Sequence, residues 1–231
     1  MLSPVAVRSI FRWPNQQCAL CHLPLRDGDH FWCQPCLTSL PQPPYCHHCG
    51  ATTPKPVPHC GHCLRQPPPW DRLVRLGEYA FPLNRLIQQY KFQRKFWLSQ
   101  PLARLLATQI TDPAPLLLPV PMHPWRRLIR GFNQSALLAD ALAALTGGQT
   151  DCRAIQRTQW ARHQHQLTRQ ARLQNLRQAF ILKKRAWPSH VALVDDVVTT
   201  GSTVSVLSQL LRQQHVRRID VYCLGFTPKQ H

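Results

Sequence analysis

Acidic residues are scarce in this sequence. Of its 231 residues, 10 are aspartate or glutamate and 28 are lysine or arginine, and Glu78 is the single glutamate. The formal net charge is therefore +18 at pH 7 with neutral histidines. So large an excess of positive charge indicates partners that carry negative charge, such as phosphorylated metabolites or nucleic acids.

Long apolar runs are also missing. No stretch approaches the roughly 20 apolar residues of a membrane-spanning helix, which excludes such a helix. The segment from Met1 to Gln17 does not read as a signal peptide, because Pro4 and Arg8 interrupt its apolar run and no small-residue cleavage site follows. We therefore expect a cytoplasmic protein. Apolar residues still make up 44% of the chain, enough for a globular core, which excludes wholesale disorder.

Cysteine and proline are concentrated at one end of the chain. Residues 1–69 contain 8 of the 10 cysteines and 13 of the 22 prolines. Because proline lacks an amide donor and fixes φ, this segment cannot form long helices or continuous sheets. At roughly 150 residues per domain, the length allows one domain and a smaller one. We expect a cysteine-rich double zinc-ribbon module over residues 1–69 and a second domain over residues 70–231.

The eight cysteines of the first segment form four Cys-x-x-Cys pairs. Two intervening residues let both sulfurs of a pair bind one ion, and two pairs complete a tetrahedral site. We expect two structural Zn²⁺ ions, whose binding supplies folding energy to a segment too short for a large core. With both sites filled, the net charge is about +14. The expected ligands are Cys18, Cys21, Cys33, Cys36, Cys46, Cys49, Cys60 and Cys63.

The spacing leaves the pairing of these ligands open. Consecutive pairs would give two ribbons, and interleaved pairs would give a cross-brace. A disulfide framework is disfavoured, because no secretion signal is present and the cytosol keeps thiols reduced. Gly50 and Gly61 suit turns with positive φ that point amides at the sulfurs. Four histidines near the second site are expected to face solvent, since four thiolates already saturate the ion. They are His47, His48, His59 and His62.

After residue 69 the sequence alternates between predicted strands and predicted helices. Strands are expected over 72–79, 116–120, 191–194 and 218–224, and helices over 83–90, 98–110, 134–145 and 203–213. Strands separated by helices predict a parallel sheet that is covered by helices on both faces. The expected fold class is therefore α/β.

The stretch from Val191 to Thr203 has the residue pattern of a ligand-binding site. A buried strand is expected to end in two carboxylates, and a loop rich in threonine, serine and glycine then opens a helix. Open α/β sheets bind ligands at the carboxyl ends of their strands. Free amides and hydroxyls at the helix start form a cradle for a phosphate monoester, while the carboxylates suit a sugar's vicinal hydroxyls. The expected ribose 5-phosphate ligands are Asp195, Asp196, Thr199, Thr200, Gly201, Ser202 and Thr203.

This stretch resembles the 5-phosphoribosyl-1-pyrophosphate (PRPP) motif of type I phosphoribosyltransferases. The resemblance implies the parallel sheet of those enzymes and, as ligand, PRPP with Mg²⁺ or a related phosphoribosyl compound. Two further stretches narrow the family. They are the strand end Leu118-Pro-Val-Pro121 and the segment Arg130-Gly-Phe-Asn-Gln134.

The order of these features resembles the ComF/GntX family over nearly the whole chain. The family order is a zinc module, a Pro-Val-Pro strand end, the Arg-Gly-Phe-Asn-Gln segment and a PRPP loop. This resemblance implies a role in DNA uptake for competence or in the use of extracellular DNA as a nutrient. It also implies a protein of the DNA uptake machinery as a candidate partner. The biochemical activity in the family is usually assigned only from the fold.

Three arginines follow the Pro-Val-Pro segment and could bind a pyrophosphate as bidentate donors. Arg126 and Arg127 are equally well explained as a solvated basic face. Arg130 is favoured, because Gly131 and a helix start at Asn133 would place it near the bound anion. Asp195, Asp196 and Arg130 are thus the expected catalytic residues.

The interval between Asp151 and Asp195 contains nine arginines or lysines and no acidic residue. In the implied fold this interval holds the loop that closes over PRPP. A basic loop fits a multiply charged substrate and fits a nucleic-acid groove equally well. Two functions therefore stay open. One is an Mg²⁺-dependent phosphoribosyltransferase, and the other is a non-catalytic PRPP sensor or adaptor that binds single-stranded DNA or protein.

Overall fold

The computed structural model describes residues 17–26, 28–29, 31–93, 95–122, 131–157 and 178–227. By its contacts the chain divides into two compact units, Met1–Leu40 and Pro41–His231, and each is described by itself. The second group of four cysteines belongs to the larger unit. The division at residue 69 that the composition suggests stays a prediction.

The smaller unit is built around its four cysteines. Gln17 forms an isolated antiparallel bridge with Pro24, and the short helix α1 (Gln34–Thr38) follows. Cys33 is the N-cap residue of α1, and Pro35 lies in the first turn, where a missing amide costs no helical hydrogen bond. Few of its described side chains are buried, which agrees with a fold that depends on bound metal.

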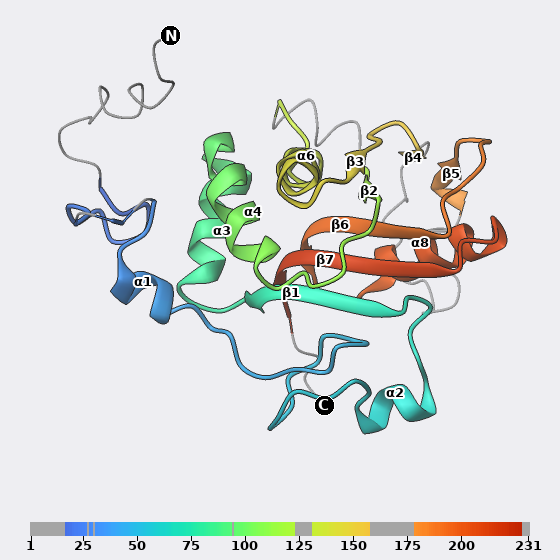
Figure 1. Ribbon diagram of the computed structural model, residues 1–231, viewed down its shortest axis with the longest axis horizontal. Coiled ribbons are helices and arrows are strands. Elements are labelled where there is room, and N and C mark those ends of the chain that lie inside the picture. Colours follow the sequence, from blue (N-terminus) through green and yellow to red (C-terminus); the bar gives the residue numbers. More distant parts are fainter. Residues whose placement is uncertain are drawn as a thin grey trace, which may run out of the picture. The chain divides into compact units, whose positions relative to one another are not determined.

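A five-stranded parallel sheet forms the centre of the larger unit (Figure 1). Its strands lie in the order β1-β7-β6-β2-β3. The long central strands are apolar on both faces, as expected when helices cover both sides of a parallel sheet. The predicted α/β class is confirmed. The strands are β1 (Arg72–Glu78), β2 (Leu116–Pro119), β3 (Gln149–Thr150), β6 (His190–Val198) and β7 (Arg218–Phe226).

Helices pack on both faces of this sheet. Three helices cover one face, joined by the 3₁₀ turn η1 (Phe96–Leu98) between the first two (Figure 1). They are α3 (Leu83–Phe92), α4 (Ser99–Ala107) and α6 (Gln134–Thr146). Helix α8 (Ser202–Gln213) shares an apolar cluster with alternate strand residues, among them Val191, Leu193 and Val221. None of the helices within the described ranges is long and apolar enough to cross a membrane.

Strand β6 is longer than the sequence predicts. It pairs with β7 as far as Val198 and Phe226, so it runs four residues past the expected end at Val194. Adjacent aspartates disfavour a strand locally, but pairing with β7 outweighs that preference. Asp195 and Asp196 consequently lie within β6 and not after its end. A small antiparallel pair was not predicted at all, namely β4 (Ile155–Arg157) and β5 (Phe180–Leu182).

The chain leaves β2 and β6 in opposite directions. Strand β2 is followed by α6 and then by β3 at its outer side, whereas β6 is followed by α8 and then by β7 on the other side. Ligands of open α/β sheets bind where the strand order reverses in this way. Pro119, the last residue of β2, pairs with Val194, so the rest of β6 projects beyond β2 into that crevice.

Residues of the second cysteine segment lie along β1, one of the two edge strands of the sheet. The amide of Leu73 donates to the His47 carbonyl over 2.7 Å, and the amide of Glu78 donates to the Pro41 carbonyl over 2.8 Å. The guanidinium of Arg75, which is 2% exposed, lies 4.7 Å from the centre of the Tyr45 ring. This segment, which includes α2 (Gly61–Arg65), therefore covers the edge of the sheet.

Candidate functional site

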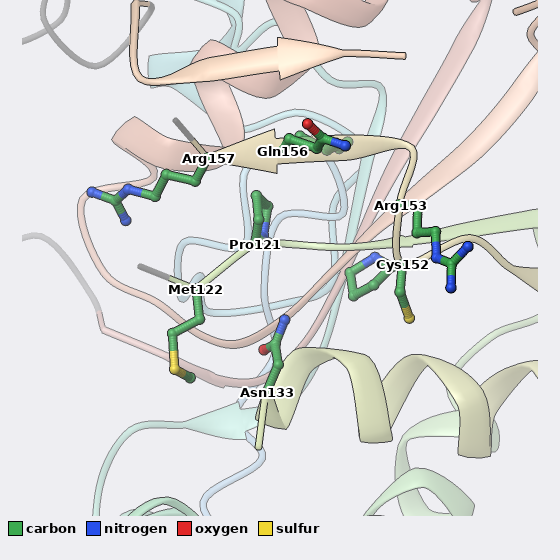
Figure 2. A pocket seen from close by; sticks show the side chains of 9 residues that line it. Pro121, Met122, Asn133, Cys152, Arg153, Gln156 and Arg157 are labelled. Carbon is green, nitrogen blue, oxygen red and sulfur yellow. The ribbon is translucent and has the colours of Figure 1, made fainter. Parts of the chain in front are cut away.

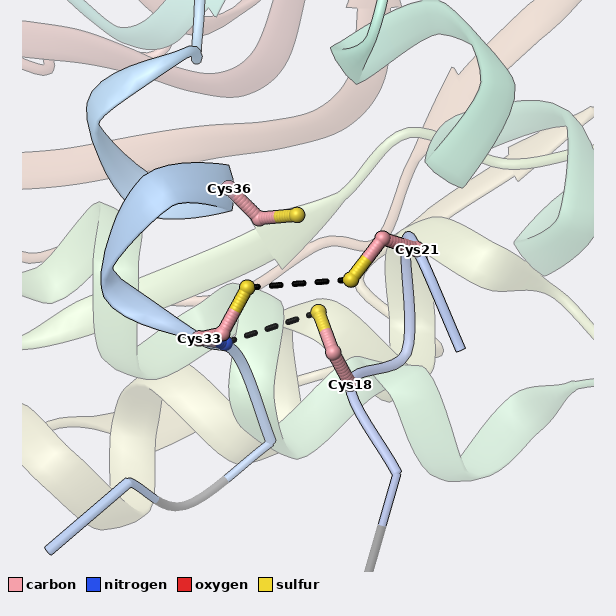
Figure 3. Close-up of side chains that lie close together, drawn as sticks. All are labelled: Cys18, Cys21, Cys33 and Cys36. Carbon is pink, nitrogen blue, oxygen red and sulfur yellow. Dashed lines mark hydrogen bonds between the residues drawn. The ribbon is translucent and has the colours of Figure 1, made fainter. Parts of the chain in front are cut away.

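Four sulfurs of the smaller unit converge on one point (Figure 3). The sulfurs of Cys21 and Cys33 are 3.7 Å apart, and the amide of Cys33 lies 3.5 Å from the Cys18 sulfur. Four thiolates at about 2.3 Å from one tetrahedral Zn²⁺ are separated by about 3.8 Å. The arrangement of Cys18, Cys21, Cys33 and Cys36 therefore has the size of a zinc site.

The second cluster, in the larger unit, has the same dimensions. Cys46 and Cys63 have their sulfurs 3.8 Å apart, Cys49 and Cys60 have theirs 3.7 Å apart, and the Cys60 amide donates to the Cys46 sulfur over 3.1 Å. Each cluster combines consecutive Cys-x-x-Cys pairs, so the two-ribbon arrangement is confirmed and the cross-brace is wrong. Two structural zinc ions fit these residues.

The residue after each first Cys-x-x-Cys pair adopts positive φ. Gly50 has φ +83° and follows Cys49, and His22 has φ +61° and follows Cys21. Gly61, expected to share this conformation, instead opens α2. At the Gly50 position a side chain is also excluded by space, because an added Cβ would lie 2.6 Å from Leu73. A histidine in the left-handed region carries no local sequence signal, so its role was missed.

His48 is buried, contrary to the expectation that it faces solvent. Its Nε2 lies 2.7 Å from the carbonyl oxygen of Trp70, and the indole Nε1 of Trp70 donates to the His48 carbonyl over 2.7 Å. Trp70 is buried in the apolar cluster beneath α8, where its ring lies against Gly201. Through these two residues the metal-binding turn contacts the loop that follows β6.

The two adjacent carboxylates of β6 lie at the crevice beside β2. Ser135, in the first turn of α6, donates from Oγ to Asp195 Oδ1 over 3.0 Å, and the Asp196 amide donates to the same oxygen over 2.9 Å. Lys91, near the end of α3, lies with Nζ 2.9 Å from Asp196 Oδ1, and both side chains are largely buried. Sequence reasoning missed Lys91 and Ser135, because only the tertiary fold brings α3 and α6 to β6.

Burial and the neighbouring charge of Asp196 raise the pKa of Asp195 to about 7. The Asp196 amide, Ser135 and Lys91 oppose this shift without cancelling it. Asp195 therefore holds a proton over a pH range in which an ordinary aspartate is ionised, until a cation or hydrogen-bond donor joins it.

The loop from β6 to α8 is a short turn that carries several hydroxyl groups. Gly201 has φ +72° and precedes the first helical residue, Ser202. The φ value favours glycine, and an added Cβ would lie 3.2 Å from Trp70, a tight contact that the ring would have to relieve by shifting. The hydroxyls of Thr200 and Ser202 are 2.9 Å apart, and Thr199 and Thr200 are exposed. The residues expected to bind ribose thus lie within β6, and those expected to bind phosphate lie in the turn that follows it and, for Ser202 and Thr203, in the first turn of α8.

A cavity of about 350 Å³ opens between the end of β2, the start of α6 and β4 (Figure 2). This volume lies within the range of small-molecule pockets. Asn133, the N-cap of α6, points into it two residues before Ser135, so the cavity adjoins the carboxylates through one helix turn. The residues around it include two cations and no acid: Pro121, Met122, Asn133, Cys152, Arg153 and Arg157.

Several expected site residues lie outside the described ranges. These are Arg126, Arg127 and Arg130 and, within the basic interval after Asp151, residues 158–177. Their expected roles in binding pyrophosphate or nucleic acid therefore stay predictions.

No protein-family model matches the chain. Individual relatives do. The chain is 38% identical over 222 residues to "Competence protein F" of Haemophilus influenzae, covering 91% of this chain and 97% of that protein. It is also 38% identical over 216 residues to "DNA utilization protein YhgH" of Escherichia coli strain K12, covering 90% and 95%. The chain belongs to the ComF/GntX family. The predicted resemblance is confirmed.

We expect this ComF/GntX protein to contain about two zinc ions per chain when it is purified without chelator, as measured by elemental analysis. Replacing Cys21 or Cys49 with serine should each remove about one ion, because each change leaves three thiolates in one cluster. Cys152→Ser is the matched control, since Cys152 lies outside both clusters and should leave the metal content unchanged. Metal-free protein with both cysteine segments resistant to protease would contradict the assignment.

Gly201→Ala should lower the free energy of unfolding by more than Gly147→Ala. Both glycines have φ above +70°, which costs about 1 kcal/mol or more for alanine, but nothing lies within 4 Å of a Cβ at Gly147. The excess cost at Gly201 measures its contact with Trp70, so a Trp70→Phe background should reduce it. Urea denaturation measures the cost of Gly201→Ala and of Gly147→Ala, each in the parent and in the Trp70→Phe background. Equal costs at the two glycines would show that Trp70 does not constrain the loop.

Asp195→Asn should stabilise the ligand-free protein near pH 8 and have little effect near pH 4. The raised pKa means that the folded state binds a proton which the unfolded chain has released, so the parent loses stability as pH rises from about 4 to about 7. Asparagine mimics the protonated form and removes that loss. Thermal unfolding of parent and variant across this pH range gives the difference. A stability difference that does not depend on pH would contradict the raised pKa.

Proposed function

We propose that this protein binds PRPP, or a related phosphoribosyl compound, in the crevice between β2 and β6. The single observation that supports this most is the position of the carboxylates of Asp195 and Asp196 beside α6, followed directly by the Gly201 turn at the start of α8. A sugar site and a phosphate site thus adjoin at the point where the strand order reverses.

The carboxylates are the proposed ligands of the ribose. Among the described residues, the recorded hydrogen bonds and ion pair to both side chains end on Oδ1. Each Oδ2 can then accept a ribose hydroxyl, in a charge-assisted bond of about 1.5–3 kcal/mol. Lys91 neutralises Asp196, which lets a multiply charged anion approach the pair.

The turn between β6 and α8 is the proposed 5′-phosphate site. The first amides of a helix have no carbonyl partner within the helix and attract an anion together with the helix dipole. The hydroxyls of Thr199, Thr200, Ser202 and Thr203 add donors around them. Gly201 supplies the positive φ with which the chain turns from β6 into the first amides of α8.

Phosphoribosyl transfer is the activity that such a site supports. Pyrophosphate leaves C1′ with the bonding electrons through an oxocarbenium-like transition state. A nitrogen nucleophile, either a base or ammonia, forms the new bond to C1′ and releases its N–H proton to the solvent or to the departing pyrophosphate. Mg²⁺ bound with PRPP would supply positive charge to the pyrophosphate, and Arg130 is proposed to supply more. The cavity with Arg153 and Arg157 offers space for the leaving group or the acceptor. The protein then acts by positioning and electrostatics.

A second proposal concerns DNA. The names of the relatives, Competence protein F and DNA utilization protein YhgH, support a role in DNA uptake or in the use of extracellular DNA. The net charge of +18 supports contact with a polyanion. In this role the protein is a cytoplasmic, non-catalytic adaptor, in which PRPP reports nucleotide supply and a protein of the uptake machinery is a further partner.

Replacing both Asp195 and Asp196 with asparagine should weaken binding of Mg²⁺–PRPP at least tenfold in titration calorimetry. The change keeps side-chain shape but removes two charged acceptors, each worth about 1.5–3 kcal/mol. Asp140→Asn is the matched control, because Asp140 is an exposed aspartate of α6 away from the crevice. Equal affinity of the double variant and the parent for PRPP would contradict the site assignment.

Enzyme and sensor differ in product formation. The parent, incubated with PRPP, Mg²⁺ and a panel of bases or ammonia, should release pyrophosphate only if it is a transferase. If the double variant releases no pyrophosphate and the Asp140→Asn control releases as much as the parent, the reaction takes place in this crevice. Binding of PRPP without turnover of any acceptor would favour the sensor.

A further inference from the structure

The turn between α3 and α4 exposes an unusual group of aromatic side chains. The sequence of residues 91–97 is Lys-Phe-Gln-Arg-Lys-Phe-Trp. Phe92 is 65% exposed, Phe96 is 59% exposed and Trp97 is 45% exposed. Single exposed apolar residues are common on protein surfaces, but three large exposed rings within residues 92–97 indicate an interaction surface.

These rings are held by an ordered turn. The amide of Leu98 donates to the Lys95 carbonyl over 3.0 Å, and Leu98 itself is fully buried. The Lys95 ammonium donates to Gln89 Oε1 over 3.1 Å, which ties the turn back to α3. The Phe96 ring stands edge-on to Phe132 at 6.4 Å between centroids. The exposed rings are therefore pre-organised, which lowers the entropy cost of binding a partner.

The same turn is continuous with the proposed ribose site. Lys91 forms the ion pair with Asp196, and Phe92 is the next residue along the chain. Gln134 links the helices at this point, because Tyr90 donates to its carbonyl over 2.7 Å and its side chain donates to the Lys91 carbonyl over 3.3 Å.

We propose that Phe92, Phe96 and Trp97 form a stacking platform for the bases of a single-stranded nucleic acid, with Lys95 binding its backbone phosphate. Aromatic rings interleaved with cations match an alternation of bases and phosphates. Lysine is depleted in the cores of protein–protein interfaces, so the cations disfavour a protein partner on this surface. This inference deepens the proposed role with DNA and rests on it.

Stacking and phosphate contacts respond differently to mutation and salt. Phe92→Ala and Trp97→Ala should each weaken binding of a labelled oligothymidylate about fivefold or more, without changing the salt dependence. Lys95→Gln should instead reduce the slope of log affinity against log salt by about 0.7. Exposed residues elsewhere provide the matched controls, Phe81→Ala and Lys55→Gln, which should change neither quantity. Fluorescence anisotropy of the full-length, zinc-loaded chain measures both.

The results distinguish the stacking platform from the broader proposal that the protein binds DNA. If the parent binds oligothymidylate and the aromatic variants bind it equally well, the platform is wrong and the DNA role stands. If the parent binds none even at low salt, the DNA role fails as well. A concentration-dependent mass in light scattering that Phe92→Ala abolishes would show that a second copy covers the rings, and would overturn the platform. Inorganic polyphosphate, which lacks bases, should bind the parent and the aromatic variants equally well.

Discussion

The reciprocal hydrogen bonds between His48 and Trp70 join the second cysteine cluster to the loop between β6 and α8. They fix a metal-binding turn against the residue that leads into β1. The other side of Trp70 meets Gly201, and its ring belongs to the apolar cluster between α8 and the sheet. A cysteine-rich segment without a large core is thereby connected to the loop between β6 and α8.

The two carboxylates of β6 illustrate how a strongly basic protein keeps acidic groups in place. Only ten acidic residues occur in the chain, and two of them are adjacent at the crevice. Their mutual repulsion and burial are relieved by Ser135 from α6 and by Lys91 from α3. Elements from both sides of the crevice thus hold the pair, and a ligand that offers hydroxyls can replace the missing solvation.

Much of this architecture could be predicted from sequence, because its signals are local. The cysteine spacing predicts the two four-cysteine clusters, and the alternation of strand and helix patterns predicts the parallel sheet. The chemistry expected of the stretch from Asp195 to Thr203 stays a prediction. Contacts made by folding could not be predicted. Lys91 and Ser135 reach the carboxylates only through packing, and His48 is buried by Trp70. Strands of three residues, such as β4 and β5, are too short to show a period of two.

The cover over β1 has a consequence for solubility. An outermost strand presents unpaired backbone groups that can recruit a strand from another molecule. Here the carbonyls of His47 and Pro41 accept amides of that strand, and both belong to the segment that the second cysteine cluster organises. A zinc ion bound at this cluster would therefore also protect β1 from edge-to-edge aggregation. A chain deprived of that ion would offer β1 as a template for its neighbours.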